Sequence, residues 1–236
     1  FQANQLTQFI RESILIPIDF FTSELFWGNF IIGIFVATPV SFVILGGIKR
    51  IGLIAGKIVP FMVVLYLSLG LLIIIKNLWD VPSIFKLILQ DAFTGEAVVG
   101  GLIGEVIRQG IRRAAFSNEA GLGTEVLAHG AAKTREPVRE GLVAMLGPFI
   151  DTILVCSVTA IVILLSGHWK DDLNGVSMTA KAFSSELGII GTVALSICII
   201  TFSITTMFGQ SYYGAKCTGY LFGSEKKEIY NYFYIA

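Results

Sequence analysis

The densest group of polar side chains within an apolar stretch lies towards the C-terminal end. Hydroxyl groups occur at five positions between residues 201 and 211: Thr201, Ser203, Thr205, Thr206 and Ser211. Hydroxyl oxygens are hard, neutral ligands, which suit an alkali cation better than a transition metal. Thr206 and Gln210 are four residues apart on one helix face, so both can reach one solute. Alternatively each hydroxyl bonds to its own backbone carbonyl and bends the helix, the role we expect for Thr201.

A glycine pair, Gly100-Gly101, follows a helix-unfavourable string at residues 93–95. Paired glycines allow a membrane helix to unwind where its backbone lines a cavity instead of lipid. In secondary transporters such breaks offer N–H groups to a carboxylate and carbonyl oxygens to Na⁺. Close helix packing through small residues explains the run from Gly100 to Gly104 equally well. The residues alone leave both interpretations open.

Asp151 lies near the middle of the apolar stretch 142–167, with Thr152 beside it. An ionisable group at that depth in a membrane is costly and by default indicates function. The alternative is a structural hydrogen-bond centre between helices.

The string Ser117-Asn118-Glu119 is followed closely by Gly121 and Gly123. Asn and Glu can cap helix ends, and the glycines permit a sharp turn. Ser117 and Glu119 have no His or Lys nearby in sequence that would make either a nucleophile or a base. We therefore expect a structural inner gate here, not a ligand site, and no enzymatic activity.

Composition places the chain among integral membrane proteins. It is 54% hydrophobic, 14% charged and formally neutral, and its mean hydropathy is +0.77. Soluble domains average about 25% charged residues, and one soluble core could not hide so much apolar surface. No basic run indicates nucleic acid. Cys156, Cys198 and Cys217 lie in or beside apolar segments and are expected to be small buried hydrophobic residues, not disulfides or metal ligands.

Five stretches are long and apolar enough to cross a bilayer, which takes about 20 residues. They are residues 26–47, 58–75, 97–116, 142–167 and 189–214. The third is the weakest because it contains Glu105 and three arginines. Partial helices are expected at both ends of the chain, and residues 81–90 are expected to form an amphipathic helix at the outer interface.

The loops alternate in charge in a way that fixes an orientation. Twelve of the 17 basic residues fall in one set of alternate loops and five in the other. Lys and Arg are in excess on the cytoplasmic side, so Ser117-Asn118-Glu119 is expected inside. Trp27, Trp79 and Trp169 then fall at outer span ends, where amphipathic rings prefer the headgroup region.

Several spaced motifs together resemble the alanine or glycine:cation symporter family. They run from Gly110-Ile-Arg-Arg-Ala-Ala-Phe through Ser-Asn-Glu-Ala-Gly and Gly121-Leu-Gly-Thr to Pro148-Phe-Ile-Asp-Thr. The resemblance extends from Phe1 to about Gly223. It implies an all-α, polytopic fold of LeuT type, with two inverted five-helix repeats. One transmembrane transporter domain, residues 1–236, would then be truncated at both ends and lack the first discontinuous helix.

The resemblance also implies roles for individual residues. Sodium would be bound by the hydroxyls of Thr205 and Thr206 and the carbonyl of Phe202. The substrate would contact Thr206, Gln210, Gln2 on the third helix of the family, and an unwound segment at Gly100 and Gly101. Asp151 would be structural, in a helix behind the site. Ser117, Asn118, Glu119 and Gly121 would form the gate.

The implied function is sodium-coupled symport of a small neutral amino acid, alanine or glycine, by alternating access in the plasma (inner) membrane. Na⁺ is the coupling ion, no other cofactor is expected, and the partners are the amino acid and the lipid bilayer. The alternatives are a sodium-coupled carrier of glutamine or another amino acid from the same family, or a non-transporting scaffold or channel subunit. A channel would need a repeated filter of oxygen ligands, which the sequence does not contain.

Overall fold

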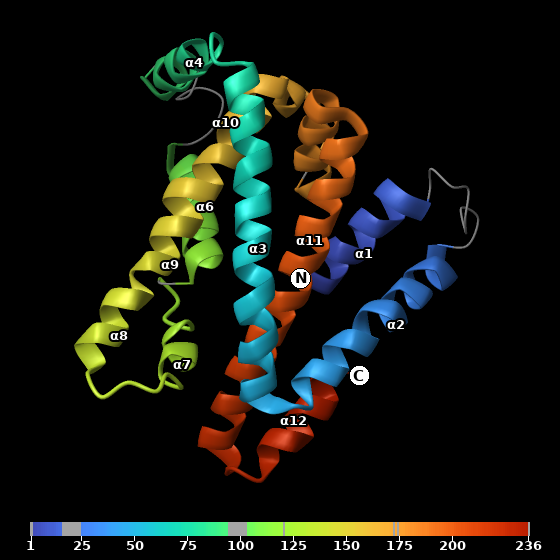
Figure 1. Ribbon diagram of the computed structural model, residues 1–236, viewed down its shortest axis with the longest axis vertical. Helices are drawn as coiled ribbons and strands as arrows, with labels where there is room; N and C mark the ends of the chain where they lie inside the picture. Colours follow the sequence, from blue (N-terminus) through green and yellow to red (C-terminus); the bar gives the residue numbers. More distant parts are fainter. Residues whose placement is uncertain are drawn as a thin grey trace. The chain divides into compact units, whose positions relative to one another are not determined.

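The computed structural model describes residues 2–15, 25–93, 103–119, 121–171, 173 and 175–235. Helices and short connections make up all of these residues (Figure 1). The longer helices are α1 (Gln2–Ile10), α2 (Leu25–Ile44), α3 (Gly47–Lys76), α4 (Val81–Phe93), α6 (Ile103–Asn118), α8 (Pro137–Ala144), α10 (Ser157–Ser166), α11 (Val176–Phe222) and α12 (Lys226–Ile235). Short helical segments are α7 (Val126–His129), α9 (Leu146–Pro148), the π-helices η1 (Arg11–Leu15) and η3 (Phe149–Cys156), and the 3₁₀ turn η4 (His168–Lys170).

Four helical stretches in the described residues can cross a membrane by length and composition. They are Phe26–Ile44, Gly47–Lys76, Pro137–Ser166 and Val176–Phe222. The prediction of an all-α, polytopic membrane protein is therefore confirmed. Of the fifth expected span, residues 103–116 are helical, whereas 97–102 lie outside the described residues.

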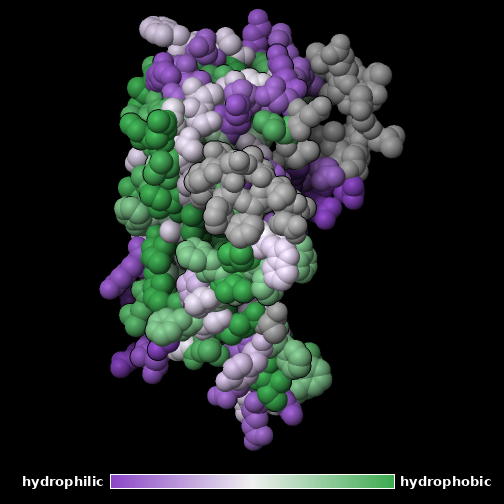
Figure 2. All heavy atoms as spheres, turned by 90° about the vertical axis from the view of Figure 1, so that its right-hand side faces the viewer, coloured by the Kyte–Doolittle hydropathy of each residue, from purple (hydrophilic) through white to green (hydrophobic). Residues whose placement is uncertain are grey.

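Lipid exposure explains the outward apolar surface of these stretches. Phe35 on α2, Leu53 on α3 and Ile189 on α11 are all more than two-thirds exposed, and many hydrophobic side chains are visible on the face in Figure 2. Water would penalise this arrangement, but lipid does not. Trp79, after α3, is also almost fully exposed.

The chain forms two compact units, which we describe separately. The first contains Phe1–Leu65, Asn174–Ala180 and Thr192–Ala236. Its hydrophobic core joins Leu6 of α1 to a row of aliphatic residues on α2 and to Met207 and Phe208 of α11. The hydroxyl of Tyr234 on α12 donates to the Met207 carbonyl at 3.1 Å, which adds a polar contact to this core.

The second unit contains Tyr66–Leu173 and Lys181–Gly191. A side chain at Gly70 on α3 would collide with Val158 on α10, so glycine permits this close approach. Val162, one turn further along α10, is fully buried. The tight packing of α3 on α10 therefore depends on a residue without a side chain.

The stretch Pro137–Ser166 changes its hydrogen-bonding pattern halfway, in the π-helix η3. Pro148 immediately precedes η3 and has no N–H to donate to a carbonyl four residues earlier. The extra residue per turn in a π-helix is common at functional sites. Asp151 lies in this altered turn.

Candidate functional site

The hydroxyl-rich part of α11 has one buried face and one more open face. Ser203, Met207 and Ser211, spaced four apart, are all buried. Phe202, Thr206 and Gln210 are also spaced four apart. Phe202 and Gln210 are exposed and Thr206 is half-buried. The row proposed to contact the ion and the solute is therefore not used by the unit's own core.

The threonine hydroxyls of this segment bond first to their own helix. Thr201 donates to the carbonyls of Ile197 at 2.7 Å and Cys198 at 3.0 Å, which confirms the local role expected for Thr201. Thr206 donates to the Phe202 carbonyl at 2.9 Å, and Thr205 contacts the Thr201 and Phe202 carbonyls at 2.9 and 3.1 Å. The local contact thus extends to both threonines assigned to sodium.

These contacts do not use up the hydroxyl oxygens. A hydroxyl has one proton to donate and two lone pairs, so Thr205 and Thr206 can donate to the helix while their oxygens face a cation. The Phe202 carbonyl is different, because two hydroxyl groups already donate to it. The geometry therefore favours the two hydroxyls over that carbonyl as cation ligands.

Sequence reasoning undervalued the two serines of this helix. Ser203 is only 4% exposed and Ser211 only 1% exposed, and Ser211 donates to the Phe208 carbonyl at 2.8 Å. Their four-residue spacing from Met207 was the signal that they share its buried face. They help fix the orientation of α11 about its axis.

Gln2 lies half-buried on α1. One turn later on the same helix, Leu6 is fully buried in the core that holds Met207 and Phe208. Residues 2–10 of α1 and residues 192–222 of α11 lie in the first compact unit. Gln2 therefore belongs to the same packed unit as Thr206 and Gln210, whereas Gly100 and Gly101 lie outside the described residues.

The predicted gate segment forms a tight turn at the end of α6. Glu119 adopts a left-handed conformation, with φ of 56°, which is uncommon for a residue other than glycine. The amides of Leu122 and Gly123 both donate to the Glu119 carbonyl at 2.9 Å. A side chain at Gly121 would press on Ala115. Small residues are thus required where this turn folds back on α6.

Two side-chain hydrogen bonds fasten the end of α6 to η3. The Ser117 hydroxyl donates to an Asp151 carboxylate oxygen at 2.7 Å, and the Asn118 amide donates to the Thr152 hydroxyl at 3.1 Å. The first residue of the gate segment therefore contacts the mid-span acid, and the second contacts the neighbour of that acid, Thr152. This arrangement fits a structural role for Asp151, which stays a prediction.

The three cysteines differ from expectation in their exposure. Cys198 is buried, but Cys156 and Cys217 are exposed, and all three are free thiols. The prediction of buried cysteines was wrong for two of them, because an apolar helix in lipid has outward as well as inward faces and composition does not distinguish these.

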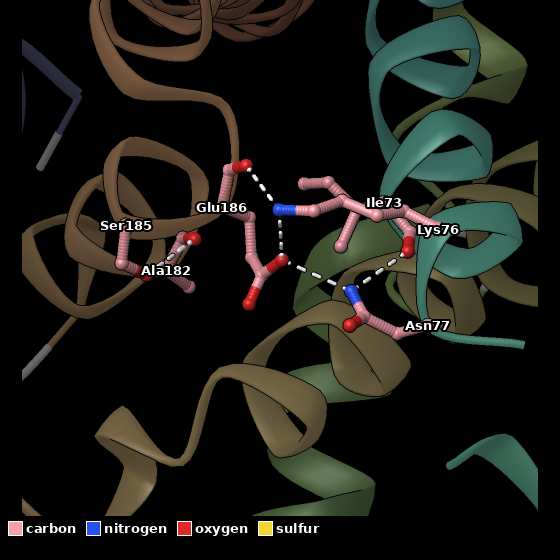
Figure 3. A network of polar contacts seen from close by, with 6 residues as sticks. All are labelled: Ile73, Lys76, Asn77, Ala182, Ser185 and Glu186. Carbon is pink, nitrogen blue, oxygen red and sulfur yellow. Dashed lines mark hydrogen bonds and ion pairs between the residues drawn. The ribbon is translucent and has the colours of Figure 1, made fainter. Parts of the chain in front are cut away.

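Two polar contacts between helical elements were not predicted from the sequence. His129 on α7 pairs with Glu140 on α8 at 2.7 Å, and Lys76, Asn77 and Glu186 form a network between α3 and α11 (Figure 3). Each joins residues that are ordinary surface types when read alone.

Comparison of the sequence with known proteins identifies the family of the chain. A family model described as the sodium:alanine symporter family matches residues 1–236. The chain belongs to this family. The family resemblance deduced from the spaced motifs is confirmed, as is the prediction of a transporter in place of an enzyme. Membership of this family supports cation-coupled amino-acid symport in general, without specifying the amino acid.

Three relatives illustrate the range of the sodium:alanine symporter family. The chain is 42% identical to the sodium/alanine symporter AgcS of Methanococcus maripaludis over 86% of its length, covering 44% of that protein. It is 35% identical to the probable sodium/glutamine symporter GlnT of Bacillus subtilis, over 90% of its length and 44% of the relative. It is 33% identical to the sodium/proton-dependent alanine carrier protein of Bacillus sp. strain PS3, over 89% and 50% respectively. The chain thus spans about half the length of these curated relatives.

Proposed function

We propose that this chain forms part of a carrier that couples Na⁺ entry to the symport of a small neutral amino acid, alanine or glycine, by alternating access. The observation that carries the proposal is the open row of Thr206 and Gln210 on α11, beside a fixed core face, in a member of the sodium:alanine symporter family. Relatives named as sodium/alanine and sodium/proton-dependent alanine carriers support alanine as the solute.

The roles of the residues follow from their chemistry. The Thr205 and Thr206 hydroxyls supply the principal oxygen ligands to Na⁺, and the Phe202 carbonyl, which already accepts from both hydroxyls, is the weaker third ligand. Thr206 also contacts the substrate, so ion and solute share one side chain and each favours binding of the other.

The remaining substrate contacts come from other elements. Gln210 faces the substrate side chain, and Gln2 offers an amide from α1. Gly100 and Gly101 provide unwound backbone for the carboxylate. The turn at Ser117, Asn118, Glu119 and Gly121, held to Asp151, forms the inner gate.

The proposed architecture is the LeuT-type inverted repeat, embedded in the plasma membrane. In that fold the five spans would be the fourth to eighth helices. The charge bias of the loops supports this only if residues 97–112 cross the bilayer. An experimental structure with those residues lying along the membrane surface would refute the topology.

A second candidate is a glutamine carrier of the same family. The similarity to a probable sodium/glutamine symporter favours it, as does the moderate size of Gln210, which leaves room for a longer substrate.

Competition against labelled alanine binding distinguishes the two candidates. The test uses a purified carrier of full family length that contains this sequence. We expect alanine and glycine to compete in the presence of Na⁺ and glutamine to compete poorly, whereas stronger competition by glutamine would reverse the assignment.

A further inference from the structure

Helix α11 contains a break that only glycine allows. Gly188 has φ of 60° and ψ of −141°, a conformation essentially restricted to glycine. At Gly191 a side chain would collide with the Phe183 carbonyl and the Leu187 side chain. The backbone therefore folds closely over itself between residues 183 and 191, within the second unit.

The break leaves a helix end that needs partners. Carbonyls in the last turn of a helix lose their intrahelical donors and must bond elsewhere. The Lys76 ammonium group donates to the Glu186 carbonyl at 2.9 Å (Figure 3). A lysine near a helix C-terminus also interacts favourably with the helix dipole. Lys76 thus stabilises the helical turn that precedes Gly188.

The Glu186 carboxylate strengthens the same attachment. Its side chain is only 18% exposed, and one of its oxygens lies 3.2 Å from the Lys76 nitrogen. The Asn77 amide donates to that oxygen at 3.0 Å and to the Ile73 carbonyl of α3, also at 3.0 Å. Two donors from the end of α3 therefore hold one acid. Ion pairs on an open surface contribute little, but a largely enclosed acid without its cation is costly.

An apolar contact accompanies this polar one. Phe183, fully buried, packs against the Tyr66 ring on α3 with a centroid distance of 5.5 Å, and Tyr66 hydrogen-bonds to Thr159 on α10. The segment 181–187 is therefore attached to α3 at two points. The Phe183 contact is stabilised by the burial of apolar surface. The Glu186 contact depends instead on hydrogen-bond geometry and on charge.

We propose that Lys76, Asn77 and Glu186 form a latch that sets how readily the break at Gly188 opens. In the transport cycle, which rests on the proposed function, Lys76 is a positioning residue. It holds segment 181–187 on α3 in one state and releases it in another. The charge bias of the loops puts this end of α3 outside, so the latch would govern the outward-facing side of the carrier.

Hydrogen–deuterium exchange of the backbone amides tests the latch without requiring transport. The protein would be a purified carrier of full family length containing this chain, in lipid nanodiscs. Lys76→Met removes the donor, and Lys76→Arg keeps both donated bonds. Lys181→Met is the matched control, because it removes an exposed lysine from the same segment.

Lys76→Met should accelerate exchange over residues 183–191 by about tenfold. The reason is that losing hydrogen bonds to a charged group raises the equilibrium constant for local opening by about this factor. Lys76→Arg and Lys181→Met should stay within about twofold of the parent. Unchanged exchange in Lys76→Met, or equal acceleration in Lys181→Met, would overturn the latch. If Lys76→Met does not fold, Glu186→Gln serves instead, because it keeps the backbone carbonyl and one side-chain acceptor oxygen but removes the charge. It should give intermediate acceleration, and parental exchange in it would refute the proposal.

A transport measurement separates positioning from simple stability. In uptake assays Lys76→Met should change the maximal rate with little change in the half-saturating alanine concentration, because the substrate contacts are untouched. An effect confined to the half-saturating concentration would contradict a positioning role. Altered exchange in a protein that transports nothing would support the latch and count against the proposed function instead.

Discussion

In the proposed site, some side chains of α11 hold the helix in its unit and others contact the transported ligands. Met207 and Phe208 are buried and fix its rotation, whereas Thr206 keeps lone pairs available after donating to the Phe202 carbonyl. The hydroxyl of Thr206 is therefore the group whose removal should separate ligand binding from folding.

Thr206→Val keeps the volume of the side chain and removes its polar group. Loss of a buried polar partner costs about 1–3 kcal/mol, which corresponds to roughly fivefold to a hundredfold in affinity. We expect both the sodium and alanine affinities to fall by this factor in equilibrium binding assays. Thr201→Val is the control, because Thr201 makes the same local bond but has no assigned ligand. Equal losses in the two variants would mean that the effect is structural.

Gln210→Trp tests the other position of the open row. The larger ring should abolish the weak competition expected from long solutes such as glutamine and spare alanine, because steric exclusion depends on solute size. Sodium dependence should stay intact, since Gln210 is not assigned to the ion. Competition assays at fixed Na⁺ measure this. A shifted sodium requirement with unchanged solute preference would show that the roles of Thr206 and Gln210 are reversed.

At the level of helices, glycines decide where the long apolar elements bend and where they pack tightly. Gly188 permits the break in α11 and Gly70 permits the approach of α10 to α3. Neither function is visible in hydropathy, which places Gly70 inside the apolar span 58–75 and Gly188 one residue before the apolar span 189–214.

Gly188→Ala should destabilise the protein, because the backbone conformation at Gly188 is essentially restricted to glycine and costs another residue about 1–3 kcal/mol. The apparent melting temperature of the purified carrier should fall by a few degrees. Gly56→Ala is the matched control, since Gly56 is helical on α3 and a methyl group there meets nothing within 4 Å. Parental stability of Gly188→Ala would contradict the strained conformation.

Gly70→Ala should also destabilise the protein, for the different reason of overpacking, which costs about 1–3 kcal/mol. The added methyl group collides with Val158. The double variant Gly70→Ala, Val158→Ala removes that collision and should recover most of the lost melting temperature. Failure of the second substitution to restore stability would indicate that the backbone, not Val158, limits the space at Gly70.

At the scale of the whole molecule, the sequence predicted what depends on composition and missed what depends on distant pairing. Apolar runs predicted an all-α membrane protein, but the span predicted at 58–75 proved to be part of a helix from Gly47 to Lys76. The apolar run begins just after Lys57, but the helix begins earlier, at Gly47, because helical hydrogen bonds do not require apolar side chains. Lys76 and Glu186 lie 110 residues apart, so no local pattern could pair them. The hydroxyl row on α11 was predictable because its spacing is local.

The central claim is that Na⁺ entry drives accumulation of alanine, and uptake into proteoliposomes tests it most directly. A carrier of full family length containing this chain would be reconstituted and given labelled alanine, with or without an inward Na⁺ gradient. A tenfold gradient supplies about 1.4 kcal/mol per ion. Alanine should therefore accumulate above its external concentration and leave when the gradient is collapsed. Uptake that merely equilibrates and ignores the imposed Na⁺ gradient would contradict symport.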